Sequence, residues 1–112
     1  MYLVLKTSKE EVEKKGSLFE AIRGHWRLDP SNAKKCEGVV VSLLGKKEIE
    51  EVYKVDEWYA STLAEGRYVF AGSVDENLSK ALVGKKLNKR LTAKGLENPV
   101  LYVEEKELLE GA

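Results

Sequence analysis

The side chains best suited to binding chemistry gather near the middle of the chain. In a chain that is only 8% aromatic, residues 58–70 contain four aromatic residues and an arginine: Trp58, Tyr59, Arg67, Tyr68 and Phe70. Aromatic faces hold a nucleic-acid base that has left its stack, and polar side chains read the edge of that base. The cluster therefore predicts either the wall of a binding pocket or the corner of a hydrophobic core.

Four residues are candidates for contacts inside such a pocket. Trp26 and Trp58 would stack on a base, while Arg67 and Asn98 would contact the base edge or a phosphate. The alternative for each tryptophan is a place in the core, because aromatic side chains dominate the buried surface of small domains. The local sequence leaves both interpretations open.

A long stretch without acidic residues is the second candidate feature. Residues 77–96 contain no aspartate or glutamate, but they include Lys80, Lys85, Lys86, Lys89, Arg90 and Lys94. Basic patches bind the phosphate backbone of nucleic acids through counterion release, without reading its sequence. We call residues 85–90 the basic segment, and the cations expected to hold a backbone are Lys85, Lys86, Lys89 and Arg90. The alternative is an ordinary solvated, lysine-rich surface.

Few residues are suited to catalysis or metal binding. The chain has one cysteine, Cys36, and one histidine, His25, and nothing in their local sequence pairs them as nucleophile and base. Zinc sites need several Cys or His ligands at short spacing, and the chain has no glycine-rich phosphate loop. The sequence therefore predicts a protein that is not an enzyme and holds no metal or cofactor.

Composition predicts one globular domain over residues 1–112. The chain is 43% hydrophobic and 34% charged, with 19 basic and 19 acidic residues, so its net charge favours no particular partner. Its apolar runs are far shorter than the roughly 20 residues of a membrane helix. Residues 1–6 lack the features of a signal peptide. A single cysteine fits a reducing compartment, and we expect a cytoplasmic protein.

Strand and helix signals follow one another along the chain. Strands are expected at residues 2–7, 39–44, 48–59, 67–72 and 100–103. Helix starts are expected at Ser8, Ser17, Asp29 and Ser73. Leu87 and Leu91 have helical spacing, and residues 104–109 could add a last helical turn. In the longest strand Val52 breaks the alternation, which indicates a bulge or a curled strand. The pattern predicts an α+β domain whose small, strongly bent sheet has five or six strands and forms an open or closed barrel.

The order of several short motifs resembles a known group of domains. The motifs are His25-Trp26-Arg27-Leu28, Val39–Leu44, Val52–Trp58, Gly66–Gly72, Leu82–Lys85 and Asn98–Val103. Together they resemble a small domain that occurs alone or attached to GIY-YIG-type nucleases, and more distantly the PUA-like group with its EVE and YTH domains. The resemblance implies a PUA-like barrel with short helices at its rim, and binding of RNA or modified DNA bases in an aromatic pocket.

The resemblance also bears on single residues. Trp26, Trp58, Arg67 and Asn98 fall on recurrent polar and aromatic positions of the small domain. The loop between Trp58 and Arg67 is short, which implies a shallow pocket. The chain has no GIY-YIG motif, so nuclease activity is not implied.

Two functional hypotheses follow from these features. The first is a non-enzymatic nucleic-acid-binding module that reads a modified or flipped base in an aromatic pocket. The second is a protein-interaction module that positions a nuclease or another partner, in which case the aromatic residues belong to the core and the basic segment is ordinary surface.

Overall fold

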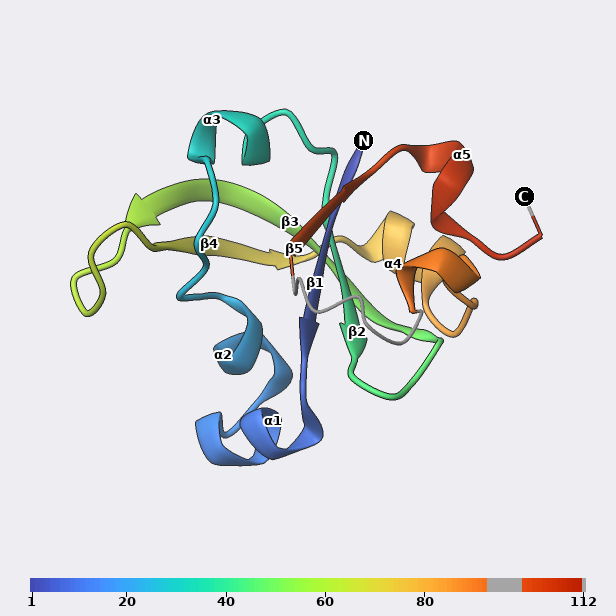
Figure 1. The fold of residues 1–112 in the computed structure, drawn as a ribbon, viewed down its shortest axis with the longest axis horizontal. Coiled ribbons are helices and arrows are strands. Elements are labelled where there is room, and N and C mark those ends of the chain that lie inside the picture. Colours follow the sequence, from blue (N-terminus) through green and yellow to red (C-terminus); the bar gives the residue numbers. More distant parts are fainter. Residues whose placement is uncertain (93–99, 112) are drawn as a thin grey trace.

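The protein is an α+β fold built on one mixed, five-stranded sheet (Figure 1). The computed structural model describes residues 1–92 and 100–111. Its strands are β1 (Tyr2–Thr7), β2 (Val39–Leu43), β3 (Ile49–Ala60), β4 (Tyr68–Val74) and β5 (Val100–Val103). The predicted strands are thus confirmed to within two residues at each end.

The strand order is β4-β3-β2-β1-β5, with β1 and β2 parallel and the other neighbours antiparallel. The sheet formed by the described residues is open, with β4 and β5 at its two edges. The α+β class is therefore confirmed, whereas barrel closure is not.

Short helices connect and flank the strands. They are α1 (Lys9–Lys15), α2 (Leu18–Ile22), α3 (Pro30–Ala33), α4 (Glu76–Leu82), the 3-10 turn η1 (Lys89–Leu91) and α5 (Glu105–Leu108). Three predicted caps are confirmed, because the side chains of Ser8, Ser17 and Asp29 each accept a backbone N–H in the first turn of the following helix.

Two helix predictions were wrong. The cap of α4 is Asp75, whose carboxylate accepts the Leu78 N–H at 3.0 Å, and not Ser73. Ser73 is still paired with Lys54 in the sheet, so the helix cannot begin there. Leu87 and Leu91 do not share a helix either, since Leu87 forms an isolated bridge with Leu109 and only residues 89–91 form a helical turn.

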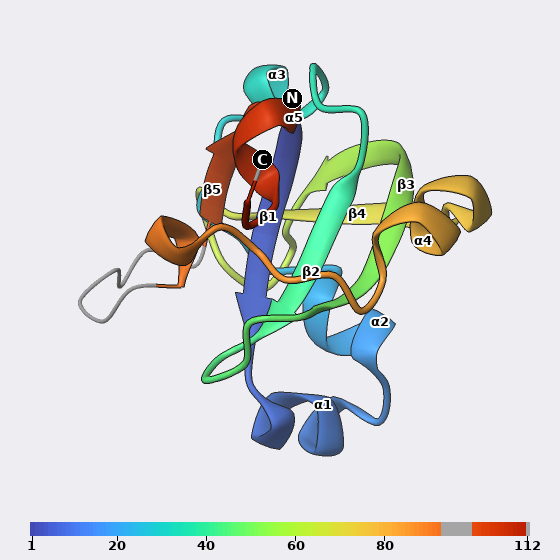
Figure 2. The same ribbon diagram turned by 90° about the vertical axis from the view of Figure 1, so that its right-hand side faces the viewer.

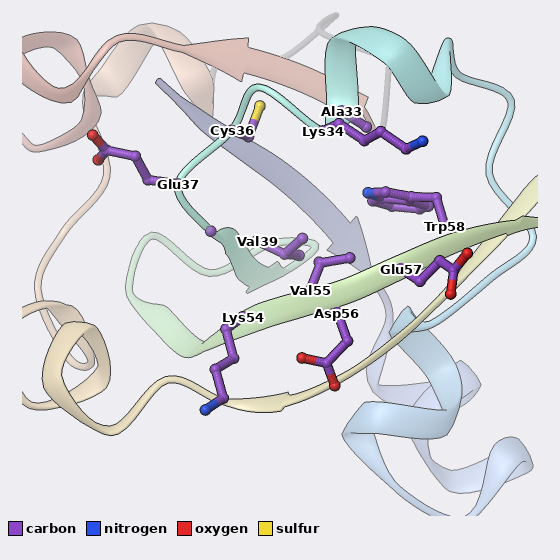
Figure 3. Close-up of a pocket in the computed structure, with 11 residues that line it drawn as sticks. Ala33, Lys34, Cys36, Glu37, Val39, Lys54, Val55, Asp56, Glu57 and Trp58 are labelled. Atoms are coloured by element: carbon purple, nitrogen blue, oxygen red, sulfur yellow. The ribbon is translucent and has the colours of Figure 1, made fainter.

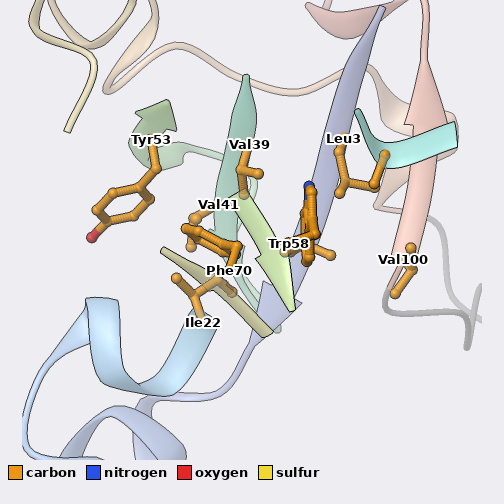
Figure 4. Close-up of a cluster of buried hydrophobic side chains, with 10 residues drawn as sticks. Leu3, Ile22, Val39, Val41, Tyr53, Trp58, Phe70 and Val100 are labelled. Atoms are coloured by element: carbon orange, nitrogen blue, oxygen red, sulfur yellow. The ribbon is translucent and has the colours of Figure 1, made fainter. Parts of the chain in front are cut away.

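The two faces of the sheet carry separate cores. One face, which we call the aromatic face, is covered by α2 and α3 and buries Val39, Val41, Tyr53, Trp58 and Phe70, among others (Figure 4). The opposite face, which we call the aliphatic face, buries Val4, Val40, Ile49, Val52 and Leu87. Figure 2 shows the segment that follows α4 crossing the aliphatic face over β1 and β2. Residues that neighbour one another in sequence can therefore lie on opposite sides of the molecule.

Two irregularities in β3 decide which side chains reach each face. The pairing with β2 shifts at Glu50, and the pairing with β4 shifts at Asp56. A bulge adds one residue to a strand, so each side chain beyond the bulge points to the face opposite to the one that strict alternation would give. Because Asp56 is the inserted residue, Trp58 shares the aromatic face with Val55 although the two are three positions apart. Both alternatives predicted for the break at Val52 are confirmed. The bulge at Glu50 places Ile49 and Val52 on the aliphatic face, and Tyr53 and Val55 pack on the aromatic face.

Candidate binding pocket

A pocket of about 390 Å³ lies beside Trp58, between the α3–β2 segment and β3 (Figure 3). Its lining comprises Ala33, Lys34, Cys36, Glu37, Gly38, Val39, Lys54, Val55, Asp56, Glu57 and Trp58. This volume falls within the range of roughly 300–1,000 Å³ that is typical of small-molecule sites.

Trp58 supplies the most informative atom of the pocket. Its side chain is only 7% exposed and packs edge-on against Phe70, with ring centroids 5.2 Å apart. Its indole Nε1 is buried, and none of the described residues accepts a hydrogen bond from it. Figure 3 shows the indole nitrogen directed toward the space below Lys34 and Cys36. A buried donor without a partner costs about 1–3 kcal/mol. An acceptor in this pocket would recover that free energy once a small shift of the surrounding side chains uncovers Nε1.

The rest of the lining is apolar in its depth and charged at its rim. Ala33 and Val39 are buried, whereas the side chains of Lys34, Lys54 and Asp56 are exposed. This arrangement suits a flat ring that enters edge first and presents an acceptor to Trp58. Charged groups attached to such a ring would remain at the rim, where both cations and carboxylates are available.

Cys36 lines this pocket and can be labelled selectively with a thiol reagent, because it is the only cysteine of the chain. Burial raises the pKa of its thiol, which outweighs the opposing effect of the N-terminal ammonium, and the negative charge of Glu104 adds a smaller increase. Since the thiolate is the reactive form, we expect Cys36 to be alkylated by iodoacetamide more slowly at neutral pH than an unstructured cysteine peptide. The rate should rise with pH over a range displaced upward from that of the peptide, and mass spectrometry over time measures it.

The control for this prediction is the same reaction in denaturant, where the rate should match that of the peptide. A native rate equal to or above that of the peptide at neutral pH would contradict the burial of the thiol.

Trp26 and Arg67 lie outside this lining and brace the chain between α2 and α3. The Trp26 indole donates to the Ile22 carbonyl at 2.6 Å, and its backbone pairs with Tyr68. Arg67 Nη1 donates to the carbonyl of His25 at 3.0 Å. Both side chains are half-buried and attach this connecting segment to the end of β4. The structure therefore does not bring Trp58 and Arg67 together in one cavity.

The basic segment lies on the far side of the sheet from Trp58. Leu87 is fully buried in the aliphatic face. Lys6 donates to the carbonyl of Leu91, the residue that follows the basic segment, and so holds the end of the segment against β1. Arg90 contacts the carboxylate of Glu107, and Lys89 lies 3.9 Å from that of Glu110. The predicted backbone contact is therefore remote from the Trp58 pocket, and two of its four cations already have acidic neighbours.

Two of the residues named in the sequence predictions, Asn98 and Lys94, lie outside the residues that the structure describes.

In the described part of the chain, no group of three or more His, Cys, Asp or Glu side chains is arranged to hold a metal ion. None of the described helices is long and apolar enough to cross a membrane.

The contact between His25 and Ser61 was not predicted from the sequence. His25 Nδ1 lies 2.6 Å from Ser61 Oγ, across 36 positions of sequence. The pair has the form of a base and a nucleophile, but Ser61 Oγ also accepts the backbone N–H groups of Leu63 and Ala64 at 3.1 Å. Ser61 Oγ therefore stabilises the β3–β4 turn by accepting two of its backbone N–H groups. No local signal predicts the contact, because it depends on how α2 packs against β4.

Comparison of the chain with known proteins found no relative. No family model matches the chain, and neither curated proteins nor solved structures include a significant match.

Proposed function

We propose that the protein is a non-enzymatic binding module that accepts a single nucleobase of a nucleic-acid strand in the pocket beside Trp58. The observation that carries this proposal is the buried, unpartnered Nε1 of Trp58 beside a pocket of suitable size. Ring nitrogens and carbonyl oxygens of bases are acceptors of the kind that this donor needs. The resemblance to PUA-like base-binding domains points to the same function.

The position of the pocket changes which cations would hold the strand. A base must leave its stack to enter a pocket of this kind, and its phosphates then follow the rim. Lys34 and Lys54 lie at that rim. Lys85 and Lys86 directly precede Leu87, which is buried in the opposite, aliphatic face. We therefore assign the phosphate contacts nearest the bound base to Lys34 and Lys54.

Replacing Trp58 with phenylalanine separates binding from folding. The variant keeps an aromatic ring but removes the N–H donor, so affinity for single-stranded oligonucleotides should fall about tenfold, the equivalent of one hydrogen bond. The free energy of unfolding should fall by no more than about 1–2 kcal/mol, because removing the unsatisfied buried donor offsets part of the cost of the smaller ring in the core. Fluorescence anisotropy at low ionic strength, with and without base methylation, measures the affinity.

Trp26→Phe is the matched control. It removes the hydrogen bond to Ile22, so it should lower stability by about 1 kcal/mol and leave affinity unchanged. Binding that is absent at low ionic strength, or equal in the Trp58→Phe variant and the wild type, would overturn the base-pocket proposal. The protein-interaction alternative predicts one of these two outcomes.

A further inference from the structure

A second pocket, of about 440 Å³, lies between α2 and the β3–β4 turn and shares no lining residue with the pocket beside Trp58. Its lining comprises Lys15, Glu20, Arg23, Gly24, His25, Tyr59, Ala60, Ser61, Thr62, Leu63 and Val69. Both pockets have two cationic side chains, but this one adds a histidine and three hydroxyl groups and has one carboxylate where the first pocket has three. None of these residues belongs to the binding site proposed above.

The hydrogen bonds of Ser61 determine which ring nitrogen of His25 carries the proton. A serine hydroxyl has two acceptor lone pairs and one proton to donate. Both lone pairs are occupied, since Ser61 Oγ accepts the N–H groups of Leu63 and Ala64. Its proton must then be donated to His25 Nδ1, 2.6 Å away. The neutral ring of His25 is therefore protonated at Nε2, and Nε2 finds no acceptor among the described residues.

Three contacts hold His25 in place. Arg67 donates to its carbonyl oxygen at 3.0 Å, and Ser61 holds its Nδ1. The preceding Gly24 lies so close to β4 that a Cβ at that position would be 2.1 Å from Val69 Cγ1. A donor fixed in this way loses little conformational entropy when it binds a ligand.

The charges of the lining favour an anion. Lys15 and Arg23 supply two positive charges against the single carboxylate of Glu20. Glu20 Oε1 lies 3.5 Å from Arg23 Nη1, and both side chains are about half exposed, so this ion pair is weak. The guanidinium has five N–H donors, and one exposed contact leaves most of them available.

We propose that this pocket binds a phosphate group, with His25 Nε2–H and the Arg23 guanidinium as donors and Lys15 as a charge partner. Phosphate oxygens accept charge-assisted bonds from arginine, whose planar fork of donors matches phosphate and carboxylate groups. The inference rests on geometry separate from the Trp58 pocket, so it stands or fails independently of the proposed function.

NMR spectroscopy of the histidine ring tests this proposal directly, because His25 is the only histidine in the chain. Long-range ¹H–¹⁵N spectra of the free protein should show the neutral ring protonated at Nε2. Titration with inorganic phosphate at constant ionic strength should shift the ring signals saturably, whereas chloride should not. A nucleoside 5′-monophosphate and a dinucleotide then distinguish a terminal from an internal phosphate as the source of the group.

Two substitutions with opposite expected effects make the test decisive. Arg23→Gln should weaken phosphate binding about fivefold, and Glu20→Gln should strengthen it roughly threefold, because one removes a donor and the other a competing carboxylate. Lys85→Gln, on the other side of the sheet, is the control and should change nothing. A ring protonated at Nδ1, a shift that chloride reproduces, or equal affinities for all variants would overturn the proposal.

Discussion

Replacing Gly72 with alanine is expected to lower the free energy of unfolding by about 3 kcal/mol, the upper end of the range for overpacked sites. Gly72 lies opposite the bulge in β3, where the two strands approach closely. A Cβ at this position would lie 2.0 Å from the carbonyl oxygen of Lys54. The neighbour is backbone and cannot rotate away, so β3 and β4 must separate to admit the methyl group. Urea denaturation followed by circular dichroism measures the loss.

The control for Gly72→Ala is Ser73→Ala, the next residue of the same strand. Ser73 is exposed, so its replacement should change stability by no more than about 0.5 kcal/mol. Equal stabilities for the wild type and Gly72→Ala would mean that the strands are farther apart at the bulge than the structure shows.

Replacing Phe70 with alanine should be the most destabilising side-chain truncation on the aromatic face, at about 3–5 kcal/mol. Phe70 is 1% exposed, and its ring contacts those of Phe19, Tyr53 and Trp58 at centroid distances of 5.8, 6.3 and 5.2 Å. The truncation leaves a cavity among these rings and also removes the wall that holds the Trp58 indole. Thermal and urea denaturation measure the loss, and tryptophan fluorescence should report a changed environment at the same time.

Leu63→Ala is the comparison for that truncation, because Leu63 is 82% exposed on the β3–β4 turn. Its effect on stability should stay within about 0.5 kcal/mol. A loss below 1 kcal/mol for Phe70→Ala would contradict the central position of this ring in the core.

The sequence predicts the elements of this fold well wherever their signals are local. The helix caps at Ser8, Ser17 and Asp29 depend on side chains that bond their own first turn, and all three are confirmed. The cap predicted at Ser73 failed because pairing with Lys54 extends β4 beyond it. The helical spacing of Leu87 and Leu91 was misleading, since the aliphatic face buries both residues from a mostly non-helical segment.

The candidate site was less predictable, because it depends on long-range geometry. The sequence identified Trp58 but could not show that its indole nitrogen is buried without a partner, which depends on α3 and β2. The sequence predicted that the basic segment holds the backbone of the strand whose base enters the aromatic pocket, whereas the sheet separates that segment from Trp58. The acidic neighbours of Lys89 and Arg90 come from the chain end, about twenty positions away. Such partners carry no signal in local composition.

The bulge at Asp56 has a consequence for how this strand tolerates insertions and deletions. With Asp56 removed, the remaining pairs from Val55–Gly72 to Trp58–Phe70 would join into regular alternation, and Trp58 would keep its face. A residue added or lost elsewhere between Val52 and Trp58 would exchange inward and outward side chains unless a bulge moved to absorb it. Position 56 is therefore where evolution or design can shorten β3 by one residue. The deletion would remove a carboxylate from the pocket rim and leave the Trp58 indole on the same face of the sheet.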